Sequence, residues 1–318
     1  MGSLGYAYSL MKRRTRSWLR LALLILLVGG VYLVMRNFEQ QFIYAPSAFI
    51  KKTPRQAKLP FDNIALTTDD GVYIQGWFIP AHGPEEASAT NSSPPTLLLF
   101  HGAIGNISDY LGKTHLLHDM GVDVFTIDYN GYGKSGGAPS ESGLASDALA
   151  AYFYLTEKRH VKPERIYLYG EDLGAAVAID LATKVSAAGL ITEGASASVI
   201  EKIEEAWPLI PWQYLLRNKF DSLTKIRDVH MPLLIIHSVD DEAVSFNDSR
   251  RLCALAHEPK ELLEIHGAHC DAFVHSSDSF DLYYDKVSHF IFDQPRDQTA
   301  GTSSSTQTAA PASKESRP

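Results

Sequence analysis

IYLYGEDLGAAVAI, residues 166–179, is the stretch that decides the fold of this 318-residue chain. Its first residues form an apolar run typical of a buried strand, and its alanine-rich second half is typical of a helix. Gly170 and Gly174 lie two residues before and after Asp172, so the backbone can turn sharply there and raise the Asp172 side chain above the sheet. The stretch therefore predicts a strand, a tight turn and a helix, with a carboxylate at the top of the turn.

Strand and helix patterns alternate along much of the chain. A pair of alternating segments around Asp69-Asp70-Gly71 predicts a β-hairpin. Apolar runs typical of buried strands lie near residues 96–100, 122–127, 166–169, 189–192, 233–236 and 260–265. Helical patterns lie between or after them, at 108–120, 143–159, 173–185, 248–256 and 277–290. This order predicts an α/β fold with a mainly parallel central sheet covered by helices on both faces.

Asp172 has a structural and a chemical interpretation. Aspartate is a favoured helix N-cap, because a carboxylate at that end accepts hydrogen bonds from free N–H groups and faces the positive end of the helix dipole. The same N–H groups would also hold the negative charge of a reacting carboxylate. The cap interpretation accounts for Asp172 alone, and it does not account for the acid and the histidine described below.

Three further motifs carry a family resemblance. They are His101-Gly102-Ala103-Ile104 after a buried strand, Asp128-Tyr-Asn-Gly131-Tyr132-Gly133-Lys-Ser135, and Lys219-Phe-Asp221-Ser. With the turn at Asp172, these motifs make residues 60–293 resemble the α/β-hydrolase superfamily. The chain is most similar to the membrane-anchored, short-lidded branch grouped with serine aminopeptidase-like, acylglycerol and acyl-thioester hydrolases.

The resemblance implies a catalytic triad in the chain order nucleophile, acid, histidine. The acid is expected just after the strand at 233–236, where the spacing favours Asp241 and leaves Asp240 as the alternative. His269 matches the Gly-x-His pattern of the family, whereas His266 precedes the glycine and fits it less well. The resemblance therefore implies the set Asp172, Asp241 and His269.

The resemblance also implies an oxyanion hole made by the backbone N–H groups of Ala103 and Leu173. Backbone donors do not depend on side-chain identity, so an alanine is acceptable in this loop. The lid is expected at about residues 195–222, where Trp207, Trp212 and Tyr214 are candidates to stabilise a leaving group or to pack the lid onto the core or a membrane.

The chain departs from the family pattern at Asp172, where most members carry serine. A carboxylate needs no deprotonation and can attack an electrophilic sp³ carbon, as in the haloalkane dehalogenase and epoxide hydrolase branches. His269 would then activate water to hydrolyse the resulting ester. Attack on an acyl ester would instead give an anhydride, which makes a carboxylate a poor nucleophile for that substrate. The loop His101-Gly102-Ala103-Ile104 also lacks the proline typical of epoxide hydrolases.

Three hypotheses follow from this departure. The first is a hydrolase of a small apolar or lipid-like substrate that uses Asp172, Asp241 and His269. The second is a catalytically silent relative of the serine hydrolases, in which Asp172 and His269 form an ion pair and the domain binds a ligand or a partner. The third is hydrolysis by water that Asp172 or His269 activates directly, without a covalent intermediate.

The N-terminal residues predict a membrane anchor. A basic tail, residues 1–16, precedes an apolar run from Trp18 to Met35 that only Arg20 interrupts. The run is near the ~20 residues needed to span a bilayer. We expect a transmembrane segment at 17–36 and a connector at 37–60. The basic tail predicts a cytoplasmic N-terminus, with the hydrolase domain, residues 61–293, on the translocated side.

A cleaved signal peptide and a buried soluble helix are the alternatives to an anchor. The run ends in Val-Tyr-Leu-Val-Met rather than in small residues, which disfavours cleavage, and its basic-then-apolar order disfavours a soluble helix. Lys51, Lys52, Arg55 and Lys58 lie on the far side of the run and weaken the predicted orientation. The Ser/Thr/Ala/Pro-rich tail, residues 294–318, is predicted to be disordered.

Composition excludes several other classes of function. The formal net charge of -8 gives no electrostatic basis for binding nucleic acid. Cys253 and Cys270 are the two cysteines, too few for a disulfide framework or a zinc site, and Cys270 is expected to be a small buried apolar residue. The sequence shows neither metal-ligand spacing nor a dinucleotide fingerprint, so no cofactor is expected. The expected partners are a small or lipid-like substrate and the membrane.

Overall fold

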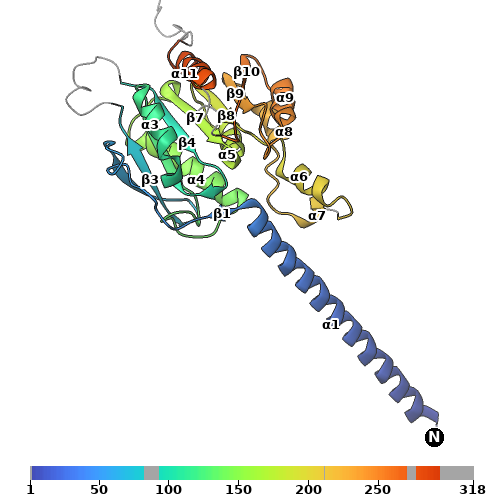
Figure 1. Ribbon diagram of the computed structural model, residues 1–318. Coiled ribbons are helices and arrows are strands. Elements are labelled where there is room, and N and C mark those ends of the chain that lie inside the picture. Colours follow the sequence, from blue (N-terminus) through green and yellow to red (C-terminus); the bar gives the residue numbers. More distant parts are fainter. Residues whose placement is uncertain (1, 82–92, 211, 271–276, 294–318) are drawn as a thin grey trace, which may run out of the picture.

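The computed structural model describes residues 2–81, 93–210, 212–270 and 277–293 (Figure 1). It shows an α/β domain at the end of one long N-terminal helix, α1 (Gly2–Ile43). The predicted disordered tail, residues 294–318, lies outside the described residues.

The central sheet has eight strands in the order β10-β9-β8-β7-β4-β6-β3-β2. The six strands from β10 to β6 are parallel, and β3 and β2 add an antiparallel edge. A separate two-stranded parallel pair joins β1 to β5. The strands are β1 (Ala45–Pro46), β2 (Asp62–Thr67), β3 (Tyr73–Ile79), β4 (Thr96–Phe100), β5 (Ile104–Gly105), β6 (Asp123–Asp128), β7 (Ile166–Glu171), β8 (Gly189–Glu193), β9 (Leu233–Ser238) and β10 (Lys260–Ile265).

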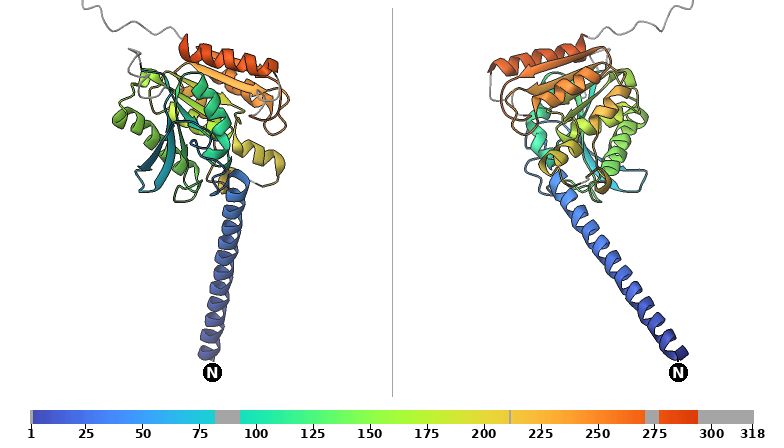
Figure 2. Two further views of the ribbon diagram at one scale, coloured as in Figure 1. Left: turned by 60° about the vertical axis from the view of Figure 1, so that its left-hand side comes forward. Right: turned by 90° about the vertical axis from the view of Figure 1, so that its right-hand side faces the viewer.

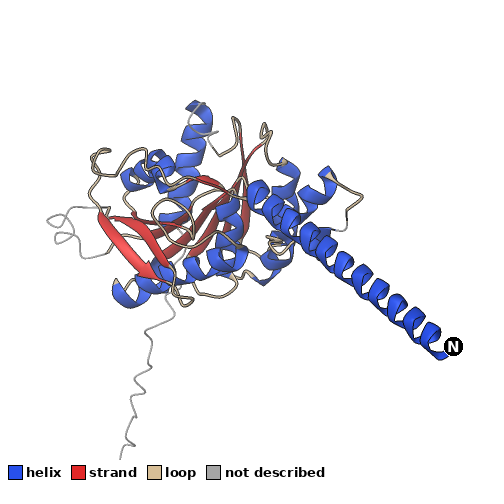
Figure 3. Cartoon of the chain, turned by 90° about the horizontal axis from the view of Figure 1, so that it is seen from below, coloured by secondary structure: helices blue, strands red, loops and turns tan. Residues whose placement is uncertain are grey.

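Helices lie on both faces of this sheet (Figures 2 and 3). They are α3 (Leu111–Asp119), α4 (Glu141–Phe153), α5 (Leu173–Ala182), α6 (Val199–Ala206), α7 (Trp212–Leu215), α8 (Ser222–Lys225), α9 (Phe246–Leu255) and α11 (Ser277–Phe292). The short helices α6 and α7 form the lid and lie beside the upper end of α1 (Figure 1).

Alternate residues of the parallel strands pack against the two helix layers. Leu98 of β4 belongs to the core shared with α4, α5 and α9, whereas its neighbours Leu97 and Leu99 belong to the core shared with α3 and α11. Because both faces are covered, the strands need apolar residues at every position, which is why they read as continuous apolar runs. The predicted α/β architecture, with its mainly parallel sheet and flanking helices, is confirmed.

The helix α1 runs without a break from Gly2 to Ile43. Its apolar part, Trp18–Ile43, is 26 residues long with a mean hydropathy of 2.2, and none of its most apolar stretch is buried against the domain. It is long and apolar enough to cross a membrane, a property that a signal sequence near the N-terminus would share. The helix also includes the first residues of the segment expected as a connector.

Candidate active site

Asp172 lies at the sharp turn between β7 and α5. Its backbone has φ 51° and ψ -115°, a conformation that side chains other than glycine rarely adopt. The turn needs glycines around it, because a Cβ on Gly170 would overlap the backbone of Gly174 and a Cβ on Gly174 would overlap the Phe100 carbonyl. The strained turn raises the Asp172 side chain above the carboxyl end of β7, where it is 31% exposed.

The backbone N–H of Ala103 holds the Asp172 carboxylate. Its Oδ2 atom accepts a hydrogen bond of 3.0 Å from the Ala103 N–H. Burial would raise the pKa of Asp172, but His269 and the N–H groups of Ala103 and Leu173 lower it below its usual value. The side chain makes no N-cap hydrogen bond to α5, so helix capping does not account for its position. Ala103 and Leu173 are the two residues expected to form the oxyanion hole.

Asp241 and His269 come together at the carboxyl ends of β9 and β10. The His269 Nδ1 atom lies 2.6 Å from Asp241 Oδ2. The other oxygen of Asp241 accepts the N–H groups of Ala243 and Val244, at 2.8 and 2.9 Å. The Asp241 side chain is only 1% exposed. Burial would raise its pKa, but hydrogen bonds with His237, His269 and the Val244 N–H lower it below its usual value. Asp241 is therefore an ionised group that orients the His269 ring.

His237 is a second buried neighbour of Asp241. Its Nε2 atom lies 3.3 Å from Asp241 Oδ2 and 3.0 Å from the Val244 carbonyl, and its Nδ1 atom lies 2.6 Å from Ser249 Oγ. The ring thus links the acid to β9 and α9 and fixes the position of its carboxylate. The role of His237 could not be predicted, because its position on a strand shows nothing about the partners that tertiary packing provides.

Asp172 and His269 face each other as an ion pair. The His269 Nε2 atom lies 3.7 Å from Asp172 Oδ1, which is too long for a hydrogen bond. Burial would lower the pKa of His269, but the two carboxylates Asp172 and Asp241 outweigh burial and raise that pKa to about 10. The resting site therefore holds a protonated histidine between two carboxylates at neutral pH.

The alternative residues Asp240 and His266 form a separate pair on the surface. His266 Nδ1 lies 2.9 Å from Asp240 Oδ2, and the two side chains are 72% and 57% exposed. Neither residue lines the cavity beside Asp172. The structure thus places the first-choice residues Asp172, Asp241 and His269 in one cluster and leaves the alternatives outside it.

A cavity of about 600 Å³ opens beside Asp172. The described residues that line it include Ile104, Tyr110, Lys113, Leu116, Glu171, Asp172, His269, Cys270 and Phe280. Of the aromatic lid residues considered above, Trp212 is buried in the lid, whereas Trp207 and Tyr214 are exposed. None of these three lines the cavity, so the structure does not support a leaving-group role for them.

Tyr110 is a residue of this cavity that sequence analysis missed. Its hydroxyl oxygen accepts the Gly102 N–H at 2.9 Å, which leaves its own proton free to donate within the described part of the chain. Burial and the nearby carboxylates Glu171 and Asp172 raise the pKa of Tyr110 above its usual value. The hydroxyl therefore stays protonated at neutral pH and is available as a hydrogen-bond donor beside Asp172.

Buried charges support the wall of the cavity. Lys113 Nζ lies 2.8 Å from Glu171 Oε1 and 2.5 Å from Glu193 Oε2, and all three side chains are at most 5% exposed. Tyr169 donates a hydrogen bond to Glu193 and lies 2.8 Å from the Tyr283 hydroxyl. The cluster connects Glu171, the residue before Asp172, to β8, α3 and α11. It therefore holds the turn at Asp172 in place.

The environment of Cys270 differs from the buried apolar one that we expect from the sequence. It is half-buried and lines the cavity, with its Sγ atom 3.5 Å from His269 Nε2. Burial and the charges of Glu193, Glu171 and Asp172 raise the pKa of its thiol well above the usual value. The thiol therefore stays neutral and contributes shape rather than a nucleophile.

The residues that follow α1 brace the loop that carries the Ala103 donor. Ala45 and Pro46 of β1 pair with Ile104 and Gly105 of β5, and the Ala45 N–H donates to the Ala103 carbonyl at 3.0 Å. The Tyr132 hydroxyl donates to the same carbonyl at 2.8 Å. The predicted connector is thus a structural part of the candidate oxyanion hole.

Comparisons with known proteins show the family to which the chain belongs. A family model described as "Serine aminopeptidase, S33" matches residues 92–225. An uncharacterized protein of Mycobacterium tuberculosis is 33% identical over 255 residues, covering 80% of this chain and 88% of its own. The chain belongs to the α/β-hydrolase superfamily.

Other members of the superfamily are similar over much of their length. YfhR of Escherichia coli is 31% identical over 275 residues, covering 85% of this chain and 93% of its own. The solved structure of the esterase Pf2001 from Pyrococcus furiosus superposes with a TM-score of 0.62 at 19% identity, covering 78% of this α/β-hydrolase and 98% of the esterase. At that identity the esterase shows the fold alone.

Proposed function

We propose that this α/β-hydrolase uses Asp172 as a nucleophile toward an sp³ carbon of a small apolar or lipid-like electrophile, such as an epoxide or a haloalkane. One observation carries the proposal: Asp172 Oδ2 is held by the Ala103 N–H, while Oδ1 faces His269. A carboxylate fixed in this way presents one oxygen for attack and keeps the other on the donors that will stabilise charge later.

In the first step, Asp172 Oδ1 forms a bond to the electrophilic carbon, and the bond from that carbon to its leaving group breaks. With an epoxide the leaving group is an alkoxide that stays on the substrate and takes the proton that His269 holds in the resting site. Tyr110, which lines the same cavity, is our candidate to donate a hydrogen bond to this oxygen. The product of the step is a neutral ester on Asp172.

Ester formation then changes the proton affinity of His269. The charge of Asp172 is one of the causes that raise the pKa of His269 to about 10, and the ester removes that charge. Once its pKa falls, His269 gives its proton to the alkoxide or, with a halide, to solvent, and the neutral ring acts as a base toward water. Asp241 stabilises the ring when it becomes charged again. The ion pair of the resting state is thus compatible with the later role of His269 as a base.

In the second step, the activated water attacks the ester carbonyl carbon of Asp172. The carbonyl oxygen becomes an oxyanion that the N–H groups of Ala103 and Leu173 stabilise. Collapse of this intermediate breaks the bond from the carboxyl carbon to the substrate oxygen and leaves Asp172 as a carboxylic acid. The substrate oxygen takes the proton held by His269 and leaves as an alcohol. The acid proton of Asp172 then passes to His269, which restores the ion pair of the resting site.

We further propose that α1 is an uncleaved anchor, with the N-terminus in the cytoplasm and the hydrolase domain across the membrane. The basic tail before Trp18 supports this orientation. The packing of the last turns of α1 against the lid and the site supports retention of the helix, since cleavage after Met35 would leave buried Glu39 in a frayed terminal segment.

An isotope experiment tests the covalent step. The purified chain, in molar excess over a reactive epoxide, is allowed a single turnover in ¹⁸O-labelled water, and the mass of the diol is measured. We expect the new oxygen of the diol to be ¹⁶O from Asp172, with ¹⁸O appearing in the protein. If water attacked the epoxide directly, the first diol would carry ¹⁸O, and the hypothesis without a covalent intermediate would replace ours.

The silent interpretation rests on the same ion pair. Asp172 and a protonated His269 neutralise each other, and the carboxylate occupies the donors that a substrate oxyanion would need in a serine hydrolase. In that case the cavity of about 600 Å³ would bind a ligand without turnover. Substitutions at Asp172 separate this interpretation from ours, as described in the Discussion.

A further inference from the structure

The lid is fixed to the part of α1 that ends the apolar run. The Glu39 carboxylate of α1 accepts hydrogen bonds from the backbone N–H groups of Arg217 and Asn218 and from the Asn218 side chain, at 2.6 to 2.9 Å. Glu39 is 3% exposed, so these bonds lie in a buried joint. The Phe42 ring also packs edge-on against Trp207 at 5.6 Å. The lid therefore has a set position relative to α1.

One contact shows how far along α1 the lid lies. The Arg217 guanidinium lies 5.7 Å from the centre of the Tyr32 ring. Tyr32 belongs to the apolar run and lies one helical turn, about 6 Å, closer to the N-terminus than Arg36. Tyrosine and arginine are typical of the boundary between headgroups and acyl chains. If α1 spans a bilayer, Arg217 must lie at this boundary.

The lid presents apolar side chains at the same level. Leu209 is 96% exposed and Tyr214 is 81% exposed, and Trp207 and Leu215 are also exposed. They lie on α7 and on the loop between α6 and α7, beside the upper end of α1 (Figure 1). Side chains of this size and character gathered in one place mark a binding surface rather than ordinary protein surface. We name Trp207, Leu209, Tyr214 and Leu215 the lid tip.

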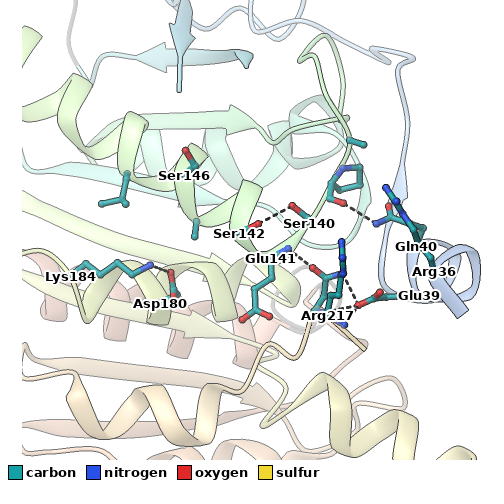
Figure 4. A pocket seen from close by; sticks show the side chains of 15 residues that line it. Arg36, Glu39, Gln40, Ser140, Glu141, Ser142, Ser146, Asp180, Lys184 and Arg217 are labelled. Atoms are coloured by element: carbon teal, nitrogen blue, oxygen red, sulfur yellow. Dashed lines mark hydrogen bonds and ion pairs between the residues drawn. The ribbon is translucent and has the colours of Figure 1, made fainter. Parts of the chain in front are cut away.

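A polar cavity of about 920 Å³ lies between α1 and α4, and Arg217 and Asn218, which follow α7, also line it. Figure 4 shows Arg36, Glu39 and Gln40 of α1 near Ser140, Glu141 and Arg217 in its wall. Lys184 is neutralised by Asp180, at 2.5 Å. Arg36 and Arg217, in contrast, have no carboxylate within 4 Å among the residues that the structure describes. Two guanidinium groups without a counter-ion at this level are suited to phosphate.

We infer that the lid tip and the two arginines dock on the leaflet that α1 leaves: the lid tip enters the outer acyl region, and Arg36 and Arg217 bind headgroup phosphates. The inference rests on the proposed anchor. The docking goes beyond the anchor, because an anchor alone would leave the domain free to turn above the bilayer. Docking fixes the domain in one orientation and commits the lid to the lipid surface as its partner.

A fluorescence experiment on the full chain tests the docking. In a Cys253→Ser, Cys270→Ser background, Leu209→Cys is labelled with an environment-sensitive fluorophore, and the protein is reconstituted in phosphatidylcholine vesicles with or without phosphatidylglycerol. Lipids with a spin label at a shallow acyl position serve as quenchers. Leu282→Cys is the matched control, since Leu282 is an exposed leucine on α11, far from α1 in Figure 1.

We expect strong quenching of the label at Leu209 and at a second position, Tyr214→Cys, and little at Leu282. Equal quenching at all three positions would overturn the docking. Adding Arg36→Gln and Arg217→Gln is expected to abolish the increase in quenching that phosphatidylglycerol causes, and an unchanged increase would overturn the phosphate contacts. Flotation of the vesicles reports on the anchor separately: protein that floats without quenching keeps the anchor and loses the docking, and protein that fails to float loses both.

Discussion

The Asp172→Asn variant is expected to lose turnover by about 10⁴-fold or more, because removing the nucleophile of a triad has an effect of this size or larger. Asparagine keeps the shape of the side chain but lacks the charge and the nucleophilic oxygen. The measurement is kcat/KM on an epoxide or haloalkane that the native chain hydrolyses. Asp240→Asn is the matched control, because this carboxylate is exposed and paired with His266 outside the cavity. It is expected to leave kcat/KM unchanged.

The Asp172→Ser variant separates our proposal from the silent interpretation. If the chain is a silent relative of the serine hydrolases, a serine at this turn would restore the hydrolysis of a p-nitrophenyl ester, while native protein would turn over no electrophile. Our account predicts that the native chain turns over a substrate with an electrophilic sp³ carbon. It also predicts that the Asp172→Ser variant does not turn over this substrate. Native turnover that survives in Asp172→Asn would contradict the account, whichever result the serine gives.

The Lys113→Met variant is expected to lower the free energy of unfolding by about 3–5 kcal/mol, the cost of removing one partner from a buried ion pair. Methionine fills most of the space but leaves Glu171 and Glu193 buried without the cation that lies 2.8 and 2.5 Å from them. The urea midpoint of the full chain in mild detergent measures the change. Lys286→Met removes a more exposed pair with Glu261 and is expected to cost less than about 1 kcal/mol.

Much of the fold was predictable, since it depends on local patterns. The runs at residues 96–100 and 233–236 are continuous apolar segments, and such segments form strands only where a sheet is covered on both faces. The turn at Asp172 was also predictable from the sequence, because its glycines are needed for a close approach of two backbone segments. Spacing after β9 also selected Asp241, which the structure places 2.6 Å from His269.

The surroundings of the candidate site could not be predicted, because they depend on packing between distant segments. Lys113 lies in a helical stretch where a lysine would ordinarily face water, and only the fold brings it to two glutamates 58 and 80 residues later in the chain. The pairing of Ala45 with the loop at Ala103 joins segments that show no strand pattern. The chemical roles of Asp172, Asp241 and His269 stay predictions until the experiments above are done.

Intact-mass analysis of the His269→Ala variant tests the central claim most directly. The full chain in detergent is incubated with a panel of epoxides and haloalkanes, including long-chain members, and Asp172→Asn/His269→Ala is the matched control. Our account predicts an added mass equal to the electrophile on Asp172, because the ester forms but its hydrolysis lacks a base, and no added mass in the double variant. Turnover of an electrophile by the native chain with no trapped ester in His269→Ala would contradict the account.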